Sequence, residues 1–316
     1  MKAALIQTYG EVKNLVHQET EVPEISATQV LIKVHAAGVN PVDSYIRSGM
    51  FSDTGTHTLP LTLGWDAAGT IDQVGSGIRD FKLGDEVFVF SPFAQNGSYA
   101  EYLAVEADLV VIKPKTLSFT ESAAVPLAAV TAWQALFTEG KLQAGQRVLI
   151  HNTSGGVGSF AVQLAKAAGA YVIGTASAKN EQYVKNLGVD EFINYRTTKF
   201  EDKVDSVDLV FAAVGGDSIV ERSLKVIKPG GHLISALDDI DINLAAQHQI
   251  TYQRIWVQPN GHDLNEIKKL IEAGKVTVNL DSVFKLADAQ QAHARSESKR
   301  AVGKIVLEVI NELAAS

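Results

Sequence analysis

Two different patterns of apolar and polar residues divide the chain. In roughly the first 110 residues, short runs alternate between apolar and polar positions and are separated by glycine-containing turns; the clearest runs are 30–35, 67–74 and 86–90. Alternation with a period of two predicts strands that bury one face. We therefore expect a half-buried antiparallel sheet or a barrel in this part.

From residue 147 onward, apolar runs alternate with helical periods. The apolar runs are 148–150, 171–173, 191–195, 207–212 and 232–237. Strands that alternate with helices predict an α/β fold with a doubly wound parallel sheet. A helical period over 120–139, interrupted by Pro126, connects the two parts. Further elements are expected beyond the sheet: strands at 250–257 and 303–309, and helices at 264–274 and 287–296.

A glycine-containing turn, 153–158, follows the first of these strands. Gly155 and Gly158 match two of the three glycines of a dinucleotide fingerprint, and Thr153 stands in place of the third. A Cβ in such a turn would hold the backbone away from a pyrophosphate, and the following helix offers unpaired N–H groups to an anion. The strand, turn, helix and second strand together favour a dinucleotide site. A purely structural turn and the nucleotide site of a methyltransferase are the alternatives.

The segment after the second strand indicates which dinucleotide binds. An NAD site carries an Asp or Glu there, about 20 residues after the first glycine, to bind the ribose 2′-hydroxyl. In this chain the segment 174–180 contains no carboxylate, and the first acid after the strand is Glu181. Ser177 and Lys179 offer a hydroxyl and an ammonium instead. These groups suit a 2′-phosphate, so the pattern favours NADPH over NADH. The alternative is a solvated helix start with Ser177 as its N-cap.

Composition excludes several classes of function. The 316 residues contain no cysteine, which removes disulfides, thiol catalysis, iron–sulfur clusters and thiolate zinc sites, and the eight histidines form no close pair. A net charge of −8 argues against nucleic acid and acidic membranes as partners. No apolar stretch reaches 18 residues and no signal-peptide layout is present, so we expect a cytoplasmic protein without a metal site.

Several segments resemble a known family. They are GVNPVDSYIRSG, LPLTLGWDAAGTI, FKLGDEVFVF, GSYAEYLAV, VTAWQALF, HNTSGGVGSFAVQLAKAAGA and GKIVLEV. Together they resemble the zinc-independent medium-chain dehydrogenase/reductase superfamily, in its quinone oxidoreductase (zeta-crystallin-like) and enone reductase branch. The resemblance implies a GroES-like catalytic domain over 1–122, completed by 276–316, a Rossmann NADP-binding domain over 123–275, and a homodimer.

The resemblance also implies site residues. For the cofactor these are Thr131, Ser154, Gly155, Gly156, Val157, Gly158, Ser177, Lys179 and Tyr195. Zinc-dependent members have Cys where this chain has Asn40 and Gly-His-Glu where it has Gly64-Trp65-Asp66, and they carry a four-cysteine lobe that is absent here. The resemblance therefore implies chemistry without zinc. Tyr195 has an alternative interpretation as a core residue at the end of a strand.

Hydride delivery to a quinone or an α,β-unsaturated carbonyl compound builds negative charge on the carbonyl oxygen, which hydrogen-bond donors must stabilise when no zinc is present. Asn40, Tyr45 and Arg47 supply an amide, a phenol and a guanidinium within one short segment. In the family, the positions of Asn40 and Tyr45 face the nicotinamide and the substrate. Arg47 has an alternative role as the partner of Asp43 in a surface helix contact.

Two functions therefore remain open. The first is an NADPH-dependent oxidoreductase acting on a quinone or an enone, and Phe51 and Trp133 would favour flat, apolar acceptors. The loop 51–59 resembles that of the alkenal and enone reductases. The second is a cofactor-binding protein without turnover, as in crystallin-like relatives. The donors at Asn40 and Tyr45 favour the enzyme.

Overall fold

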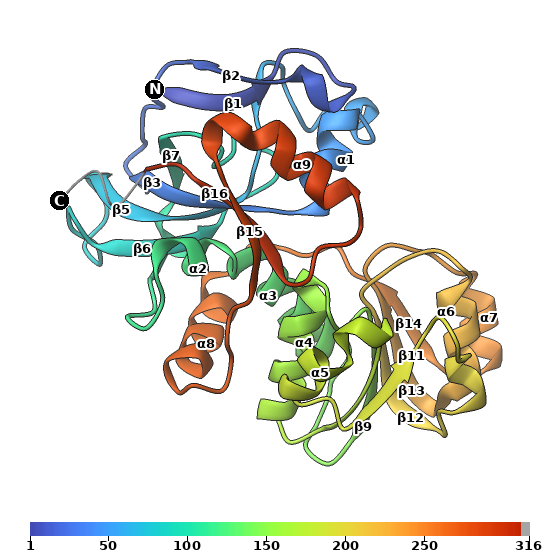
Figure 1. The fold of residues 1–316 in the computed structure, drawn as a ribbon. Coiled ribbons are helices and arrows are strands. Elements are labelled where there is room, and N and C mark those ends of the chain that lie inside the picture. Colours follow the sequence, from blue (N-terminus) through green and yellow to red (C-terminus); the bar gives the residue numbers. More distant parts are fainter. Residues whose placement is uncertain (311–316) are drawn as a thin grey trace. The chain divides into compact units, whose positions relative to one another are not determined.

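The computed structural model describes residues 1–310, which divide into two compact units (Figure 1). The first unit comprises Met1–Ala128, Pro259–Glu272 and the residues from Val278 onward, and the second comprises Ala129–Gln258 and Ala273–Thr277. The division expected from the sequence placed 123–128 and 259–272 with the parallel sheet. In the structure these residues belong to the first unit.

The second unit contains the parallel sheet, with strand order β11-β10-β9-β12-β13-β14. Each neighbouring pair is parallel. The strands are β9 (Arg147–His151), β10 (Tyr171–Ala176), β11 (Glu191–Asn194), β12 (Val207–Ala212), β13 (Ile227–Ser235) and β14 (Thr251–Arg254). Its helices are α4 (Gly156–Ala167), α5 (Glu181–Asn186), α6 (Ile219–Ser223) and α7 (Ile242–Gln247). The strand order reverses direction next to β9, which is the position where doubly wound sheets bind ligands.

Burial explains why this sheet reads as continuous apolar runs. Val148, Leu149 and Ile150 of β9 are fully buried, because β9 lies between β10 and β12 and helices cover the sheet. Figure 1 shows α4 and α5 beside β9 and β11, and α6 and α7 beside the strands at the other end of the sheet.

The first unit is built mainly of antiparallel strands. Its larger sheet has the order β15-β16-β3-β5-β6-β8, with β7 also paired to β3, and its smaller sheet has the order β2-β1-β4. The strands of the larger sheet are β3 (Gln29–Val39), β5 (Asp66–Val74), β6 (Glu86–Phe90), β7 (Tyr102–Glu106), β8 (Val111–Ile112), β15 (Leu280–Lys285) and β16 (Lys304–Glu308). Those of the smaller sheet are β1 (Lys2–Ile6), β2 (Leu15–Glu19) and β4 (Leu61–Thr62).

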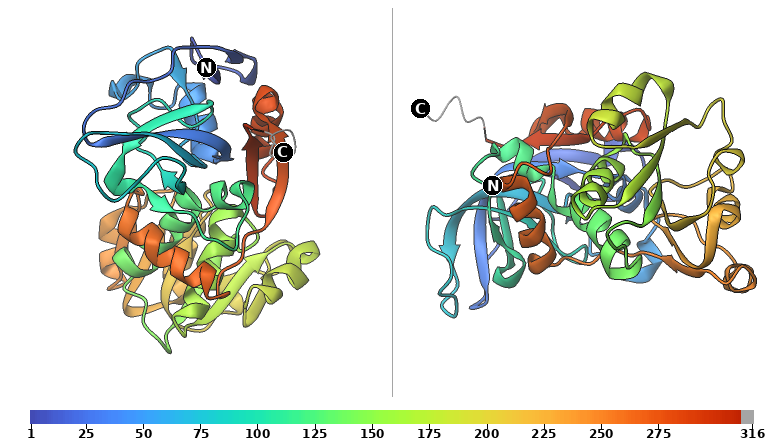
Figure 2. Two further views of the ribbon diagram at one scale, coloured as in Figure 1. Left: turned by 90° about the vertical axis from the view of Figure 1, so that its left-hand side faces the viewer. Right: turned by 90° about the horizontal axis from the view of Figure 1, so that it is seen from below.

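The late strand β16 pairs antiparallel with the early strand β3, so a segment near residue 305 completes a sheet begun near residue 30 (Figures 1 and 2). The pairing places Ile305 opposite Val39. The alternation in the sequence indicated β3, β5, β6 and β16, but it did not reveal β1, β2 or β15. The last two of these have largely exposed or half-exposed residues and lack a clear apolar face.

The helices associated with the first unit are α1 (Pro41–Ser48), α2 (Phe119–Ala123), α8 (Gly261–Glu272) and α9 (Ala289–Glu297). The helical period predicted over 120–139 is divided in the structure. It forms α2, then α3 (Pro126–Trp133), and then a π-helical segment, Gln134–Glu139. Pro126 begins α3, as its missing N–H group allows at a helix start. None of the helices within residues 1–310 has the length and apolar composition needed to cross a bilayer.

Candidate functional site

The glycine-containing turn lies between β9 and α4, at the carboxyl edge of the parallel sheet. Asn152 has a left-handed backbone, with φ of 59°, and Gly155 is the N-cap residue of α4. A Cβ on Gly158 would lie 2.1 Å from the carbonyl oxygen of Asn152. The first turn of α4 therefore packs directly on the backbone of the turn, which requires glycine at 158. The N–H groups that begin α4, at Gly156, Val157 and Gly158, are the ones that an anion at this edge would meet.

The segment after β10 lies beside this turn. The amide of Asn180 donates a 2.9 Å hydrogen bond to Ser154 Oγ, which ties the two loops together. Ser177 precedes a short 3₁₀ segment, but its hydroxyl makes no capping bond. Ser177 is therefore the N-cap residue by position, as the alternative interpretation had it, but its hydroxyl does not form the capping bond. Lys179 is exposed one turn further on.

The loop after β11 adds a second cation at the same edge. Tyr195 directly follows β11 and is 56% exposed, so it is not a core residue. The guanidinium of Arg196 lies 5.8 Å from the centre of its ring, and Arg196 Nε lies 3.4 Å from its hydroxyl. Glu181, the acid nearest to Lys179 in sequence, pairs with Lys185 at 2.7 Å. The edge thus presents hydroxyl groups and cations together. Arg196 was not among the residues expected at the cofactor, although it directly follows Tyr195 in the sequence.

Thr131, the remaining residue expected at the cofactor, lies on α3 and is buried. It is distant in sequence from the turn, and only the family resemblance pointed to it.

The second constellation lies in the first unit, where β3 leads into α1. Asn40 is the N-cap residue of α1, Pro41 begins the helix, and Gly49 ends it with φ of 92°. Asp43 caps the helix start, because its Oδ2 accepts a 2.8 Å hydrogen bond from the backbone N–H of Asn40. Asn40 and Asp43 thus form a capping box at the start of α1.

The side chain of Asn40 lies between Asp66 and Lys304. Its Nδ2 donates a 2.8 Å hydrogen bond to Asp66 Oδ2, and Lys304 Nζ donates to its Oδ1. Lys304 Nζ also lies 3.5 Å from Asp66 Oδ2, and all three residues are at most 3% exposed. Burial raises the pKa of Asp66 and lowers the pKa of Lys304, while their mutual attraction opposes both shifts.

Asp43 and Tyr99 form a further buried pair beside this cluster. Tyr99 donates a 2.6 Å hydrogen bond to Asp43 Oδ2, and Asp43 Oδ1 is buried without a partner in the described part of the chain. Burial raises the pKa of Asp43 to about 7, against the opposing hydrogen bond from Tyr99, and burial also raises the pKa of Tyr99. The carboxyl group of Asp43 therefore titrates near neutral pH.

Arg47 points toward α9 and is 3% exposed. Its guanidinium donates to the carbonyl oxygen of Gly10 at 2.6 Å, to His293 Nδ1 at 3.3 Å and to the carboxylate of Glu297. Burial and the charge of Arg47 lower the pKa of His293 to about 3, so the imidazole is neutral and can accept this bond. The alternative of a surface pair between Arg47 and Asp43 is wrong, because Asp43 is fully buried and bonds to Asn40 and Tyr99.

Tyr45 differs from its neighbours on α1. Its side chain is half-buried, and its hydroxyl has no hydrogen-bond partner within residues 1–310. The structure thus brings Asn40 and Tyr45 together on one short helix, with the phenol still available to donate.

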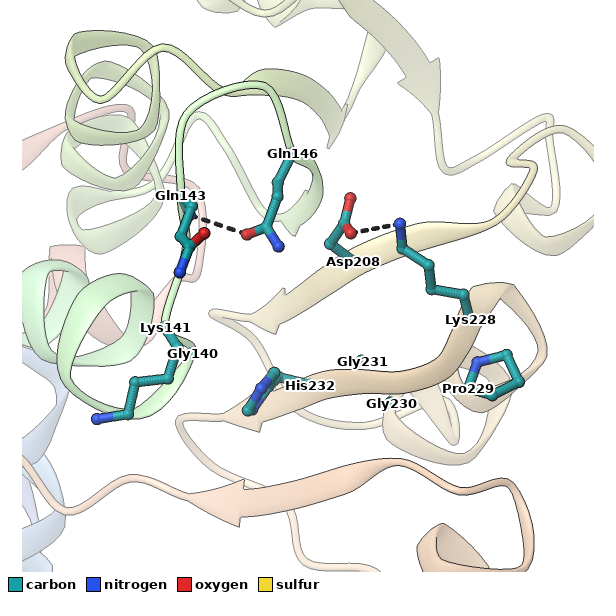
Figure 3. Close-up of a pocket in the computed structure, with 10 residues that line it drawn as sticks. All are labelled: Gly140, Lys141, Gln143, Gln146, Asp208, Lys228, Pro229, Gly230, Gly231 and His232. Atoms are coloured by element: carbon teal, nitrogen blue, oxygen red, sulfur yellow. Dashed lines mark hydrogen bonds and ion pairs between the residues drawn. The ribbon is translucent and has the colours of Figure 1, made fainter.

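A cavity of about 310 Å³ in the second unit lies at the opposite edge of the parallel sheet (Figure 3). Gln146, which precedes β9, and Lys228, Pro229, Gly230 and Gly231, at the start of β13, line it. Because parallel strands share one direction, this edge is the amino edge, remote from the glycine-containing turn. Figure 3 shows Lys228 directed at Asp208, with which it forms an ion pair. The cavity is therefore separate from the candidate cofactor site.

The donors in the first unit do not fit a zinc ion. Among the described residues, no three His, Cys, Asp or Glu side chains are grouped so that they could hold a metal. At Asn40 and Asp66, the ammonium of Lys304 already supplies a positive charge to both oxygen atoms. A cation added there would be repelled by Lys304.

Comparison with known proteins identifies the family. Residues 26–115 match the alcohol dehydrogenase GroES-like domain, and residues 187–307 match the family described as zinc-binding dehydrogenase. The chain is 37% identical over 318 residues to the chloroplastic NADPH-dependent alkenal/one oxidoreductase of Arabidopsis thaliana, covering 97% of this chain and 79% of that protein.

Solved structures agree with this assignment. The quinone oxidoreductase of Coxiella burnetii superposes with a TM-score of 0.91 at 34% identity, over 98% of this chain and 99% of that one. The quinone oxidoreductase of Escherichia coli, complexed with NADPH, gives a TM-score of 0.88 at 29% identity, over 98% of this chain and all of that one (100%). The predicted pair of a GroES-like domain and a Rossmann-like domain is confirmed. The chain belongs to the medium-chain dehydrogenase/reductase superfamily, in its quinone oxidoreductase and enone reductase branch.

Proposed function

We propose that the protein is an NADPH-dependent oxidoreductase that reduces a quinone or an α,β-unsaturated carbonyl compound without zinc. The observation that carries this proposal is the edge formed after β10 and β11. There, Ser177 and Lys179 follow the strand after which an NAD-specific enzyme has a carboxylate, and Tyr195 and Arg196 follow the neighbouring strand. The acceptor class rests on the relatives, which are an alkenal/one oxidoreductase and quinone oxidoreductases.

The residues of the second unit would bind the cofactor through two groups, the pyrophosphate and the 2′-phosphate. The N–H groups at the start of α4 would bind the pyrophosphate, and Gly155 and Gly158 keep the turn close enough for that contact. Lys179 and Arg196 would bind the 2′-phosphate by charge-assisted hydrogen bonds, with Ser177 and Tyr195 donating hydroxyl groups. When bound, NADPH supplies the hydride.

The residues of the first unit would act on the acceptor. A carbonyl oxygen that gains negative charge needs donors that are already in place. Asn40 and Tyr45 can each donate one hydrogen bond to it, since the Tyr45 hydroxyl has no partner within the described residues and the Asn40 amide has a second hydrogen. We assign Arg47 to the link between α1 and α9 rather than to the acceptor, because its guanidinium is already bonded to three partners.

An acceptor panel tests this proposal. Stopped-flow oxidation of NADPH is followed with benzoquinones, 2-alkenals, enones and simple ketones, with and without EDTA. We expect turnover with a quinone, an alkenal or an enone, no turnover with simple ketones, and no effect of EDTA. Tight NADPH binding without oxidation by any acceptor would favour the second function, a cofactor-binding protein without turnover.

Two further expectations belong to this proposal. A homodimer is expected from the family resemblance, and light scattering in solution gives the mass that tests it. We also propose a cytoplasmic location, and fractionation of the source cells tests it.

A further inference from the structure

Asn40 lies between two buried groups of opposite charge, and this fixes the direction of its amide. An ammonium can only donate hydrogen bonds and an ionised carboxylate can only accept them. Oδ1 must therefore face Lys304 and Nδ2 must face Asp66, as they do in the structure. A flipped amide would direct its NH₂ group at the ammonium and its oxygen at the carboxylate, which loses both bonds and adds two repulsions.

Lys304 is itself held firmly. It begins β16, whose pairing with β3 brings it beside Val39 and Asn40, and its Nζ also donates to the carbonyl oxygen of Val39 at 3.3 Å. The side chain is 3% exposed. An ammonium with three oxygen partners in a buried place is fixed in position, because every alternative position leaves its charge unpaired.

The oriented amide of Asn40 has one hydrogen that is not used in these bonds. Nδ2 carries two hydrogens, and the bond to Asp66 uses one of them. The other has no acceptor among residues 1–310. A donor that is oriented before the acceptor arrives needs no reorganisation during the reaction, which is the condition under which such donors stabilise developing charge most strongly.

We infer that Lys304 is a positioning residue that orients the Asn40 amide toward the carbonyl oxygen of the quinone or enone acceptor. The inference rests on the proposed function, in which Asn40 donates to that oxygen. Asp66 completes the arrangement from the other side of the amide. Lys304 itself does not touch the acceptor in this role.

A double-mutant cycle tests the inference. Loss of one preorganised donor lowers kcat by about 100-fold or more, so we expect such a loss for Asn40→Ala and a loss of about 10-fold or more for Lys304→Met. Because Lys304 acts through Asn40, adding Lys304→Met to Asn40→Ala should change kcat by less than about three-fold. If the two losses multiply, or if Lys304→Met keeps full kcat while Asn40→Ala is impaired, the inference is wrong and the proposed function stands.

Lys113→Met provides a matched control. Lys113 is also a buried lysine of the first unit, 6% exposed, and it donates to Leu117 and pairs with Glu86, apart from Asn40. We expect reduced stability but unchanged kcat. If Lys304→Met does not fold, the double variant Lys304→Met/Asp66→Asn replaces it. The same loss of kcat is expected, because the Asn40 amide then has no charged groups on either side to orient it.

A measurement without turnover separates this inference from the proposed function. The side-chain NH₂ signals of Asn40, assigned by their absence in Asn40→Ala, are followed by NMR. We expect the NH₂ hydrogens of Asn40 to exchange slowly with solvent in the wild type and faster in Lys304→Met. Unchanged exchange overturns the positioning role. Absence of NADPH oxidation by the wild type with every acceptor overturns the proposed function instead.

Discussion

Tyr99 donates a 2.6 Å hydrogen bond to Asp43 within a fully buried pair, although 56 residues separate them in the chain. The same carboxylate oxygen accepts the backbone N–H of Asn40. Asp43 thus connects the helix that carries Asn40 and Tyr45 to the interior of the first unit. The burial that fixes this helix also changes the acidity of the carboxyl group.

The pH dependence of stability should report on Asp43. Its pKa is about 7 in the folded protein, above the unfolded value of about 3.9, so the folded state binds a proton that the unfolded state releases between these values. The contribution of this protonation to the free energy of unfolding is fully present below about pH 4 and is lost as the pH rises through about 7. Asp43→Asn keeps an oxygen for both hydrogen bonds but cannot ionise. We expect its free energy of unfolding, relative to that of the wild type, to rise by on the order of 2 kcal/mol between pH 5 and pH 8 in urea titrations. Parallel profiles for the two proteins would contradict the assignment.

Arg47→Met should act on stability more than on substrate binding. The variant removes bonds to Gly10 and His293 as well as the ion pair with Glu297, and we expect a loss of about 1 to 3 kcal/mol in urea unfolding. Glu297→Gln is the comparison, with a smaller expected loss than Arg47→Met, because the amide oxygen can still accept a hydrogen bond from Arg47 and the bonds to Gly10 and His293 remain. A raised KM for the acceptor with unchanged stability would show instead that Arg47 takes part in binding the acceptor.

Lys179→Ala should weaken NADPH binding selectively. A charge-assisted hydrogen bond contributes about 1.5 to 3 kcal/mol, so the Kd of NADPH should rise about 10- to 100-fold while that of NADH stays constant. Fluorescence titration of both cofactors measures this ratio. The control, Lys141→Ala, removes an exposed lysine at the opposite edge of the same sheet and should change neither Kd. Equal weakening of both cofactors by Lys179→Ala would argue against a contact with the 2′-phosphate.

Alanine at the two glycines of the turn should have unequal effects. A Cβ on Gly158 would lie 2.1 Å from a backbone oxygen, whereas a Cβ on Gly155 would lie 2.7 Å from the side-chain Nδ2 of Asn152, which can rotate away. We expect Gly158→Ala to cost about 1 to 3 kcal/mol and to reduce the thermal shift produced by NADPH. Gly155→Ala should cost less than about 1 kcal/mol. Equal costs would show that the close packing at 158 does not decide the turn.

The local structure of the proposed cofactor edge was largely predictable from the sequence, because its parts lie close together in the chain. The glycines, the start of α4 and the segment with Ser177 and Lys179 lie within about thirty consecutive residues, and the order of strand, turn and helix determines where they meet. The pairing of β16 with β3 was not predictable in the same way. Lys304 appeared in the sequence only as part of an apolar strand, and its contact with Asn40 spans 264 residues.

The position of α8 shows a second limit of local patterns. Its amphipathic period predicted a helix correctly, and the expected Rossmann domain over 123–275 included it. The structure instead places it with the first unit, where Gly261 approaches the carbonyl oxygen of Asp108. A period shows that a helix has an apolar face, but it does not show which surface that face contacts.

The pairing of β16 with β3 has a consequence for synthesis on the ribosome. The parallel sheet uses strands from 147 to 254, so all of its strands have been synthesised well before the chain is complete. The sheet that contains β3 cannot be completed before residues 304–308 have been synthesised. Before that point, the ammonium of Lys304 is not present beside Asp66. A chain that ended before Lys304 would therefore contain every strand of the parallel sheet, but it would lack β16 and the ammonium that lies beside the buried Asp66.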